Sequence, residues 1–155
     1  MVSTPKKFFS GVLWLAAAVL WTAVIFSMSL KPADDSVQIS GGTLQQLLSA
    51  LGLNDLPQAQ WDALHHLIRK CAHFAEYFLL GALWHGYFHT TPVPYAWGRA
   101  WLTATATAAA DEWIQCFVEG RSGLLSDVLL DSTGALTGIL LMLSLCAAVC
   151  KWHKT

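Results

Sequence analysis

The chain has 155 residues, of which 55% are apolar and only 12% are charged, and its mean hydropathy is positive. This composition lies outside the range of soluble globular domains and indicates a membrane protein with room for one domain over residues 1–155. The net charge of −1, with no basic run and no acidic tail, argues against a nucleic-acid partner.

Four segments are apolar and long enough to cross the hydrocarbon of a bilayer, which takes about 20 residues. They cover Phe8 to Leu30, about Ile68 to Phe88, about Trp97 to Val118, and about Leu124 to Val149. The first segment is longer than the apolar part of a signal peptide and is followed by Lys31 and Pro32, so we expect an uncleaved span. The predicted fold class is all-α, a polytopic membrane four-helix bundle.

The connection over residues 31–67 has a helical pattern of its own. In "TLQQLLSALG" the apolar positions recur at helical spacing, at Leu44, Leu47, Leu48 and Leu51. Thr43 is the expected N-cap and Gly52 the expected stop. Ten residues are too few to span, so we predict a short amphipathic helix on the membrane surface. A second start signal at 54–57 opens a helix that continues into the second span.

Orientation follows from the basic residues of the short loops. One side carries Lys6, Lys7, Arg99, Lys151 and Lys154, and the other carries Lys31, Arg69, Lys70 and Arg121. The last three of these lie at helix ends beside carboxylates, where we expect them to be paired. Without Arg69, Lys70 and Arg121, the first side carries five basic residues and the second carries one. This excess predicts that both termini are cytoplasmic and that the 31–67 connection is outside.

Small residues predict where the spans pack closely. Ala100, Ala104 and Ala108 recur in the third span, and Gly134 and Gly138 form a GxxxG pattern in the fourth. In lipid such positions allow two helix backbones to approach each other.

The cysteines and most of the histidines give weaker evidence for a functional site. The four cysteines show no CxxC spacing, and Cys71 and Cys116 are expected at similar depth, which leaves a disulfide between them open. Four other histidines are expected to lie near the membrane interfaces as anchors: His65, His66, His85 and His89.

Ionisable residues interrupt three of the apolar segments. They form three clusters: Arg69, Lys70, His73, Glu76 and Tyr77; Asp111, Glu112 and Gln115; and Glu119, Arg121, Asp127 and Asp131. An isolated charge near the bilayer centre costs about 2.5 to 3.5 kcal/mol on insertion scales, so these groups should point inward and pair. Their helical spacing predicts that three faces meet in one polar chamber below the outer surface, roofed by residues 119–123.

The predicted chamber is acidic. Its six carboxylates outnumber its three cations, Arg69, Lys70 and Arg121. The excess carboxylates must be protonated, solvated or bound to a cation, because unpaired burial in a low dielectric is costly.

The same residues carry a family resemblance. The blocks "RKCAHFAEYFLLGAL" and "DEWIQCFVEGRSGLLSDVLLDSTGALTG" closely resemble the signature of the VanZ-like family, whose founding member is associated with resistance to the glycopeptide teicoplanin. The resemblance covers roughly Arg69 to Gly138. Glu119 stands where family members often have Pro, and Asp131 where Asn is frequent.

The resemblance implies a small multi-pass protein of the bacterial cell envelope, in the cytoplasmic membrane. Resistance belongs to the founding member and is not implied for this chain. The family motif itself carries no reaction that could be assigned to these residues.

Three hypotheses for the chamber stay open. In the first, it binds or moves an amphiphilic envelope component, either a lipid head group or a lipid-linked cell-wall precursor. The predicted ligand-binding residues are Arg69, Lys70, Tyr77, Asp111, Glu112, Gln115, Arg121, Asp127 and Asp131. The cations would hold phosphate, with Arg121 the best placed because its planar fork binds two oxygens.

The second hypothesis is an intramembrane hydrolase or transferase, with His73 as base and Glu76 as its orienting carboxylate. A divalent metal ion would then be the cofactor, with candidate ligands Glu76, Asp111, Glu112 and Asp127. In the third hypothesis the charges only pair across helices and fix their register.

Overall fold

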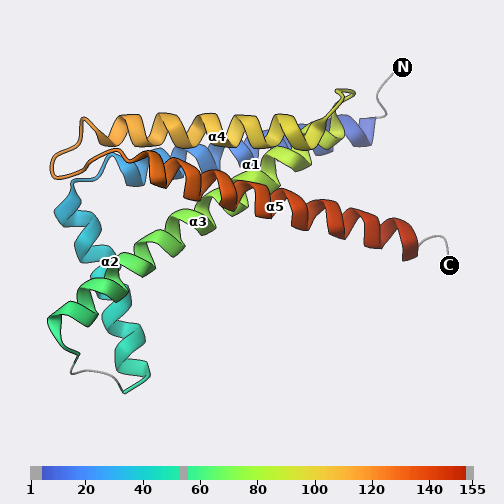
Figure 1. The fold of residues 1–155 in the computed structure, drawn as a ribbon. Helices are drawn as coiled ribbons and strands as arrows, with labels where there is room; N and C mark the ends of the chain where they lie inside the picture. The colour runs from blue at the N-terminus through green and yellow to red at the C-terminus, as the bar shows by residue number, and fades with distance from the viewer. Residues whose placement is uncertain (1–4, 53–55, 153–155) are drawn as a thin grey trace.

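The computed structural model describes residues 5–52 and 56–152. Within these ranges it contains five helices and no strand, which confirms the all-α prediction (Figure 1). The helices are α1 (Pro5–Ser29), α2 (Ala33–Ala50), α3 (Gln58–Thr90), α4 (Ala96–Gln115) and α5 (Leu125–Trp152).

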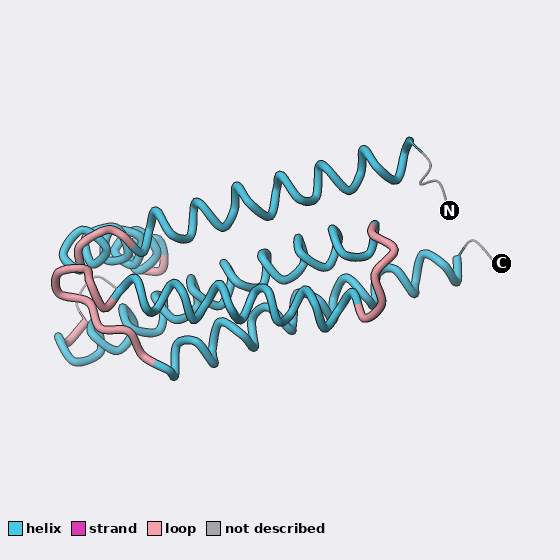
Figure 2. Tube along the Cα trace, turned by 90° about the horizontal axis from the view of Figure 1, so that it is seen from above, coloured by secondary structure: helices cyan, strands magenta, loops and turns pink. Residues whose placement is uncertain are grey.

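Helix α3 is the centre of the molecule. It packs against α1, α4 and α5, and α4 also packs against α5. The buried core at these contacts consists of Ile25, Tyr77, Leu80, Ala104, Ala108 and Ala135. Helix α2 packs on the first half of α3, away from the other helices (Figures 1 and 2).

The chain reverses direction at two opposite ends of the helices. The 91–95 loop lies at the same end as the start of α1 and the end of α5 (Figures 1 and 2). The 116–124 loop lies at the other end, together with the end of α1 and with α2.

Helix α2 is longer than the sequence pattern predicts. It begins at Ala33, ten residues before the expected start, so the assignment of Thr43 as N-cap is wrong. The Ala33 N–H donates to the Glu119 carbonyl (3.1 Å), a tertiary contact that local sequence does not reveal. The predicted end is confirmed, because Gly52 follows the helix with a φ of +71°, a conformation that favours glycine.

The helices on either side of the 91–95 loop also differ from the predicted spans. Helix α3 is continuous from Gln58, directly after Pro57, and its 33 residues extend about 50 Å. The start signal at 54–57 is confirmed in its described part, while Asn54 and Asp55 lie outside the described residues. Helix α4 ends at Gln115 rather than near 118, because the next residues form tighter i to i−3 bonds.

The predicted close packing of small residues is confirmed. Ala100, Ala104 and Ala108 are fully buried. A Cβ on Gly134 would lie 2.6 Å from the Phe74 carbonyl oxygen, and one on Gly138 would overlap the carbonyl of Phe78. Glycine is therefore needed at both positions of α5 for it to cross α3.

Apolar side chains cover the outside of the helices, and several polar ones lie inside. Leu20, Leu102 and Val149 are each more than half exposed, whereas Asp111 and Asp131 are fully buried. Among the described helices, Phe9–Ser29 and Leu125–Val149 are long and apolar enough to cross a membrane. Helices α3 and α4 are long enough, but their polar residues lower the hydropathy of the predicted spans at 68–88 and 97–118.

Candidate functional site

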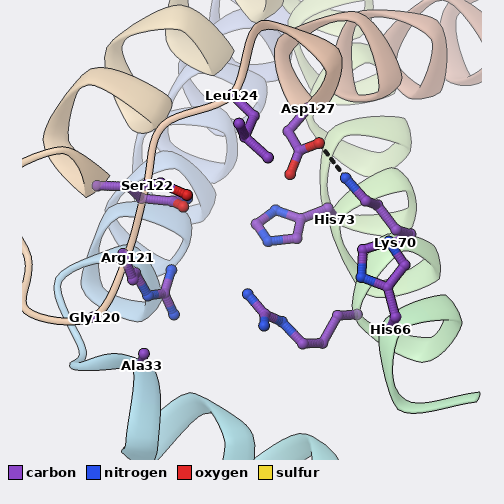
Figure 3. A pocket seen from close by; sticks show the side chains of 11 residues that line it. Ala33, His66, Lys70, His73, Gly120, Arg121, Ser122, Leu124 and Asp127 are labelled. Atoms are coloured by element: carbon purple, nitrogen blue, oxygen red, sulfur yellow. Dashed lines mark hydrogen bonds and ion pairs between the residues drawn. The ribbon is translucent and has the colours of Figure 1, made fainter. Parts of the chain in front are cut away.

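A pocket of about 200 Å³ lies at the end of the molecule that carries α2 and the 116–124 loop (Figure 3). Helix α3 forms one wall, and the start of α2, the end of α4, the loop and the start of α5 form the others. The residues that line it are Ala33, His66, Arg69, Lys70, His73, Gln115, Gly120, Arg121, Ser122, Leu124 and Asp127. Because His66, Ser122 and Leu124 are exposed, the pocket is open to the surface.

The described part of the pocket lining is mostly cationic. It includes Arg69, Lys70 and Arg121, and Asp127 is the one carboxylate among the lining residues that the structure describes. The Lys70 ammonium donates to the Asp127 carboxylate, which joins α3 to α5 (Figure 3). Arg69, by contrast, has no ion pair among the residues that the structure describes.

The loop that carries Arg121 is held in place by backbone contacts. Gly120 has a φ of +73°, and a Cβ there would lie 2.9 Å from the Cβ of Ala33. The Arg121 guanidinium donates to the carbonyl of Met28 at the end of α1 (3.4 Å). Burial lowers the pKa of Arg121 from its usual value, and the nearby charge of Arg69 lowers it further. The nearby charges of Asp111, Glu112 and Glu76 act in the opposite direction and raise this pKa.

Glu112 is hydrogen-bonded to the end of the same loop. Its Oε2 accepts a hydrogen bond from the Leu124 N–H (2.8 Å), just before the start of α5. Gly123 packs on the backbone of Glu112 and on the Cys116 Sγ, so closely that a Cβ would not fit. Glu112 is thus a positioning residue, placed behind the pocket rather than in its lining.

Asp111 belongs to a buried hydrogen-bond network. Its Oδ2 accepts from the Ser29 hydroxyl (2.9 Å) and from the Gln115 amide (3.3 Å), and the same amide also donates to the Ser29 hydroxyl (3.3 Å). Because Gln115 also lines the pocket, it connects the pocket to this interior network.

Three further predicted residues lie deeper along α3 and α5. Tyr77 and Asp131 are fully buried, and neither the Tyr77 hydroxyl nor the Asp131 oxygens have a hydrogen-bond partner among the described residues. Glu76 Oε2 lies 4.0 Å from His73 Nδ1, which is longer than a hydrogen bond.

The predicted site residues comprise some that line the pocket and others that lie behind it. Of the predicted site residues, the pocket brings together Arg69, Lys70, His73, Gln115, Arg121 and Asp127, whereas Glu76, Tyr77, Asp111, Glu112 and Asp131 lie outside its lining. Helical spacing predicts which residues share a face of a helix, but it does not predict whether they lie at the same depth along the helix axis. Tyr77 is about 10 Å along the axis from Lys70, and Asp131 about 6 Å from Asp127.

The sequence profile of the VanZ/LLP1 family matches residues 14–147. The chain belongs to the VanZ/LLP1 family. The match extends from α1 to the last turns of α5 and includes the pocket residues, which confirms the family resemblance of the sequence blocks. No curated protein and no solved structure matches the chain significantly. Family membership and the two apolar helices together indicate a membrane protein.

Some features of this VanZ/LLP1 protein differ from the sequence interpretation. His66, expected as an interface anchor, lines the pocket. Its spacing of four residues before Lys70 and seven before His73 is the signal that could have placed it there. His85, also expected as an anchor, is buried. No sequence pattern marked Ala33 as a pocket residue, because only the position of α2 brings it to the pocket.

Thiol and metal chemistry gain no support from the geometry. Cys71 and Cys116 are both exposed free thiols, so the disulfide left open above is not formed. Among the residues whose side chains the structure describes, no three His, Cys, Asp or Glu side chains are grouped as a metal ion would need. The acidic candidates Asp111, Glu112 and Asp127 instead bond to Ser29, Leu124 and Lys70.

Proposed function

We propose that this protein is a polytopic protein of the bacterial cytoplasmic membrane whose pocket binds the anionic head group of an amphiphilic envelope component. The ligand is a membrane lipid or a lipid-linked cell-wall precursor with a phosphate in its head group. The observation that carries the proposal is Arg69, a guanidinium group at the wall of an open pocket that has no hydrogen bond or ion pair among the described residues, at one end of helices with an apolar surface.

The proposed topology has α1, α3, α4 and α5 crossing the membrane and α2 at its surface. Large apolar side chains on the outside and fully buried Asp111 and Asp131 on the inside support it, because lipid-facing charge is costly. Helix α3 exceeds the hydrocarbon thickness of about 30 Å, so its first turns would extend beyond the membrane beside α2. Both termini would be cytoplasmic, and the pocket would face outward.

The pocket chemistry suits phosphate. Arg69 has no hydrogen bond or ion pair among the described residues, although it lines the cavity. Guanidinium groups bind phosphate through two parallel N–H bonds. An amphiphile that placed its phosphate here would have apolar side chains next to the pocket for its tail, since Leu124 lines the pocket and both Leu124 and Leu125 are exposed.

The geometry supports binding better than it supports the two alternatives. A hydrolase would need His73 to be oriented by Glu76, and these groups are not hydrogen-bonded. A purely structural role accounts for Lys70 with Asp127 and for Asp111 with Ser29, but not for Arg69. A cation kept at a cavity wall without a partner is better explained by a ligand that supplies the opposite charge.

The proposal is tested with the full chain in phosphatidylcholine nanodiscs, by titrating fluorescent anionic lipid and measuring its dissociation constant. Arg69→Gln should weaken binding about tenfold, the expected loss for a charge-assisted hydrogen bond. Arg99→Gln is the matched control, because Arg99 is exposed at the opposite end of the molecule. Equal affinity of the wild type and Arg69→Gln for anionic lipid would contradict the proposal.

A further inference from the structure

The hydrogen-bonding groups of the pocket define its ligand more closely than a phosphate alone. We infer that the head group bound here carries hydroxyl groups beside its phosphate, as a polyol phosphate or a sugar phosphate does. This inference rests on the proposed function and names the ligand class of the same site. It depends on three side chains of the lining: Gln115, Asp127 and Ser122.

Gln115 offers an acceptor to the pocket. Its amide nitrogen donates to Asp111 Oδ2 and to the Ser29 hydroxyl, both at 3.3 Å. Because a carboxylate only accepts hydrogen bonds, the nitrogen of the amide must face this interior network. Gln115 Oε1 receives no hydrogen bond from the described residues, although the side chain is only 5% exposed. The oxygen is therefore the atom of this amide that is left for a ligand.

Asp127 offers a second acceptor. Its Oδ1 accepts from the Lys70 ammonium and from the Ser126 hydroxyl (3.1 Å), whereas no described residue donates to its Oδ2. Figure 3 shows the Asp127 carboxylate and the His73 ring facing the same space. A ligand that covered these oxygens without supplying donors would leave them unsatisfied, which costs free energy.

A phosphate by itself does not satisfy these acceptors. Its ionised oxygens accept hydrogen bonds, which suits the guanidinium of Arg69 but not the oxygens of Gln115 and Asp127. The ligand must therefore bring donors as well as a phosphate. Ser122 adds to this requirement, because its exposed hydroxyl at the pocket wall has no hydrogen bond among the described residues and can donate or accept.

Hydroxyl groups fit the charges of the pocket better than an ammonium group, the other donor of lipid head groups. Asp127 is the one carboxylate of the described lining, and it is already paired with Lys70. An ammonium group would have to displace Lys70 or lie beside the cation of Arg69, where like charges repel. Hydroxyl groups supply the same hydrogen bonds without a positive charge.

The cavity has room for both parts of such a head group. Its volume of about 200 Å³ equals that of roughly seven water molecules. A phosphate takes up part of this space and leaves room for a substituent of the size of glycerol. Because His66 and Ser122 are exposed at its walls, a larger sugar could extend from the pocket to the outside.

The test compares phosphatidylglycerol with phosphatidylpropanol of the same acyl chains, in phosphatidylcholine nanodiscs at pH 7.5. Both are phosphodiesters with a single negative charge, and they differ in the two hydroxyl groups. The full chain should bind phosphatidylglycerol at least about fivefold more tightly, the gain expected from two further hydrogen bonds. Equal affinity would overturn the hydroxyl inference and leave the proposed function standing. Absence of binding by either lipid would overturn both.

Phosphatidylethanolamine tests the choice of donor in the same nanodiscs. It should bind more weakly than phosphatidylglycerol, because its ammonium group finds no unpaired carboxylate in the described lining. Affinity equal to that of phosphatidylglycerol, or higher, would overturn the inference in favour of an amine.

Variants assign the preference to the named side chains. Ser122→Ala and Gln115→Met should each bring the ratio of the phosphatidylglycerol and phosphatidylpropanol affinities closer to one. Ser144→Ala, at an exposed position near the other end of α5, is the matched control and should keep the wild-type ratio. Ser122 is exposed, so Ser122→Ala decides the test even if Gln115→Met fails to fold. A wild-type ratio in every folded variant would overturn the assignment.

Glycerophosphoglycerol, the same head group without acyl chains, separates a lipid from a soluble source of this chemistry. It should bind much more weakly than phosphatidylglycerol, because it has no apolar tail to contact Leu124 and Leu125. Binding as tight as that of phosphatidylglycerol would overturn the lipid part of the proposed function, while supporting a hydroxylated phosphate in the pocket.

Discussion

Lys70 on α3 donates to the carboxylate of Asp127 on α5, and this pair stands at the rim of the pocket. Both side chains are partly buried, at 26% and 17% exposure, so the pair lies between a surface and an interior salt bridge. The ion pair neutralises Lys70 and links α3 to α5, the two helices that cross closely at Gly134 and Gly138.

The first prediction concerns this ion pair. Lys70→Met should lower the free energy of unfolding by about 1 to 3 kcal/mol, because it leaves a half-buried carboxylate without its partner. Adding Asp127→Leu should recover most of the loss. A double-mutant cycle from denaturant unfolding in detergent measures the coupling, and simple additivity of the two changes would show that the pair contributes nothing.

The second prediction concerns the contact between α3 and α5. Gly138→Ala places a Cβ against the Phe78 carbonyl and should cost about 1 to 3 kcal/mol through overpacking. Gly98→Ala is the matched control, since a Cβ there meets nothing within 4 Å and favours helix formation. Thermal unfolding should move in opposite directions in the two variants. A higher midpoint in both would contradict the close crossing.

The third prediction concerns the fully buried Asp131. Asp131→Asn should leave stability unchanged or raise it by about 1 kcal/mol, because the uncharged amide costs less to bury where no partner is present among the described residues. Asp62→Asn, at an exposed position, should change little. If Asp131→Asn instead lost about 2 kcal/mol, Asp131 would have a stabilising partner that this account does not include.

The fourth prediction concerns orientation in the membrane. In a variant without native cysteines, Ser122→Cys should react with an impermeant maleimide added to intact cells from which the outer layers have been removed. Tyr95→Cys, exposed in the opposite loop, should react only after the membrane is opened. Labelling of Tyr95→Cys alone from outside would reverse the proposed topology.

Helical periodicity was enough to predict part of this site. Arg69 and His73 share a face of α3 through spacing alone, and the GxxxG pattern of Gly134 and Gly138 correctly indicated a close helix contact. These features depend on neighbours within one helix. The all-α fold also followed from composition and from the length of the apolar segments.

The sequence pattern could not predict the depth of each residue in the helix bundle or the contacts between residues far apart in the chain. Helical spacing predicts that Asp111 and Asp131 face the interior, but it does not show that they lie behind the pocket rather than in its lining. The start of α2 depends on the bond between Ala33 and Glu119, which are far apart in the chain.

The most direct test of the central claim is a structure of the full chain determined in nanodiscs that contain a saturating concentration of phosphatidate. The account predicts density for a phosphate group in the pocket at the guanidinium group of Arg69, with the acyl chains leaving past Leu124. Lipid head groups found only along the outer apolar faces of α1 and α5, with no anion in the pocket, would contradict it.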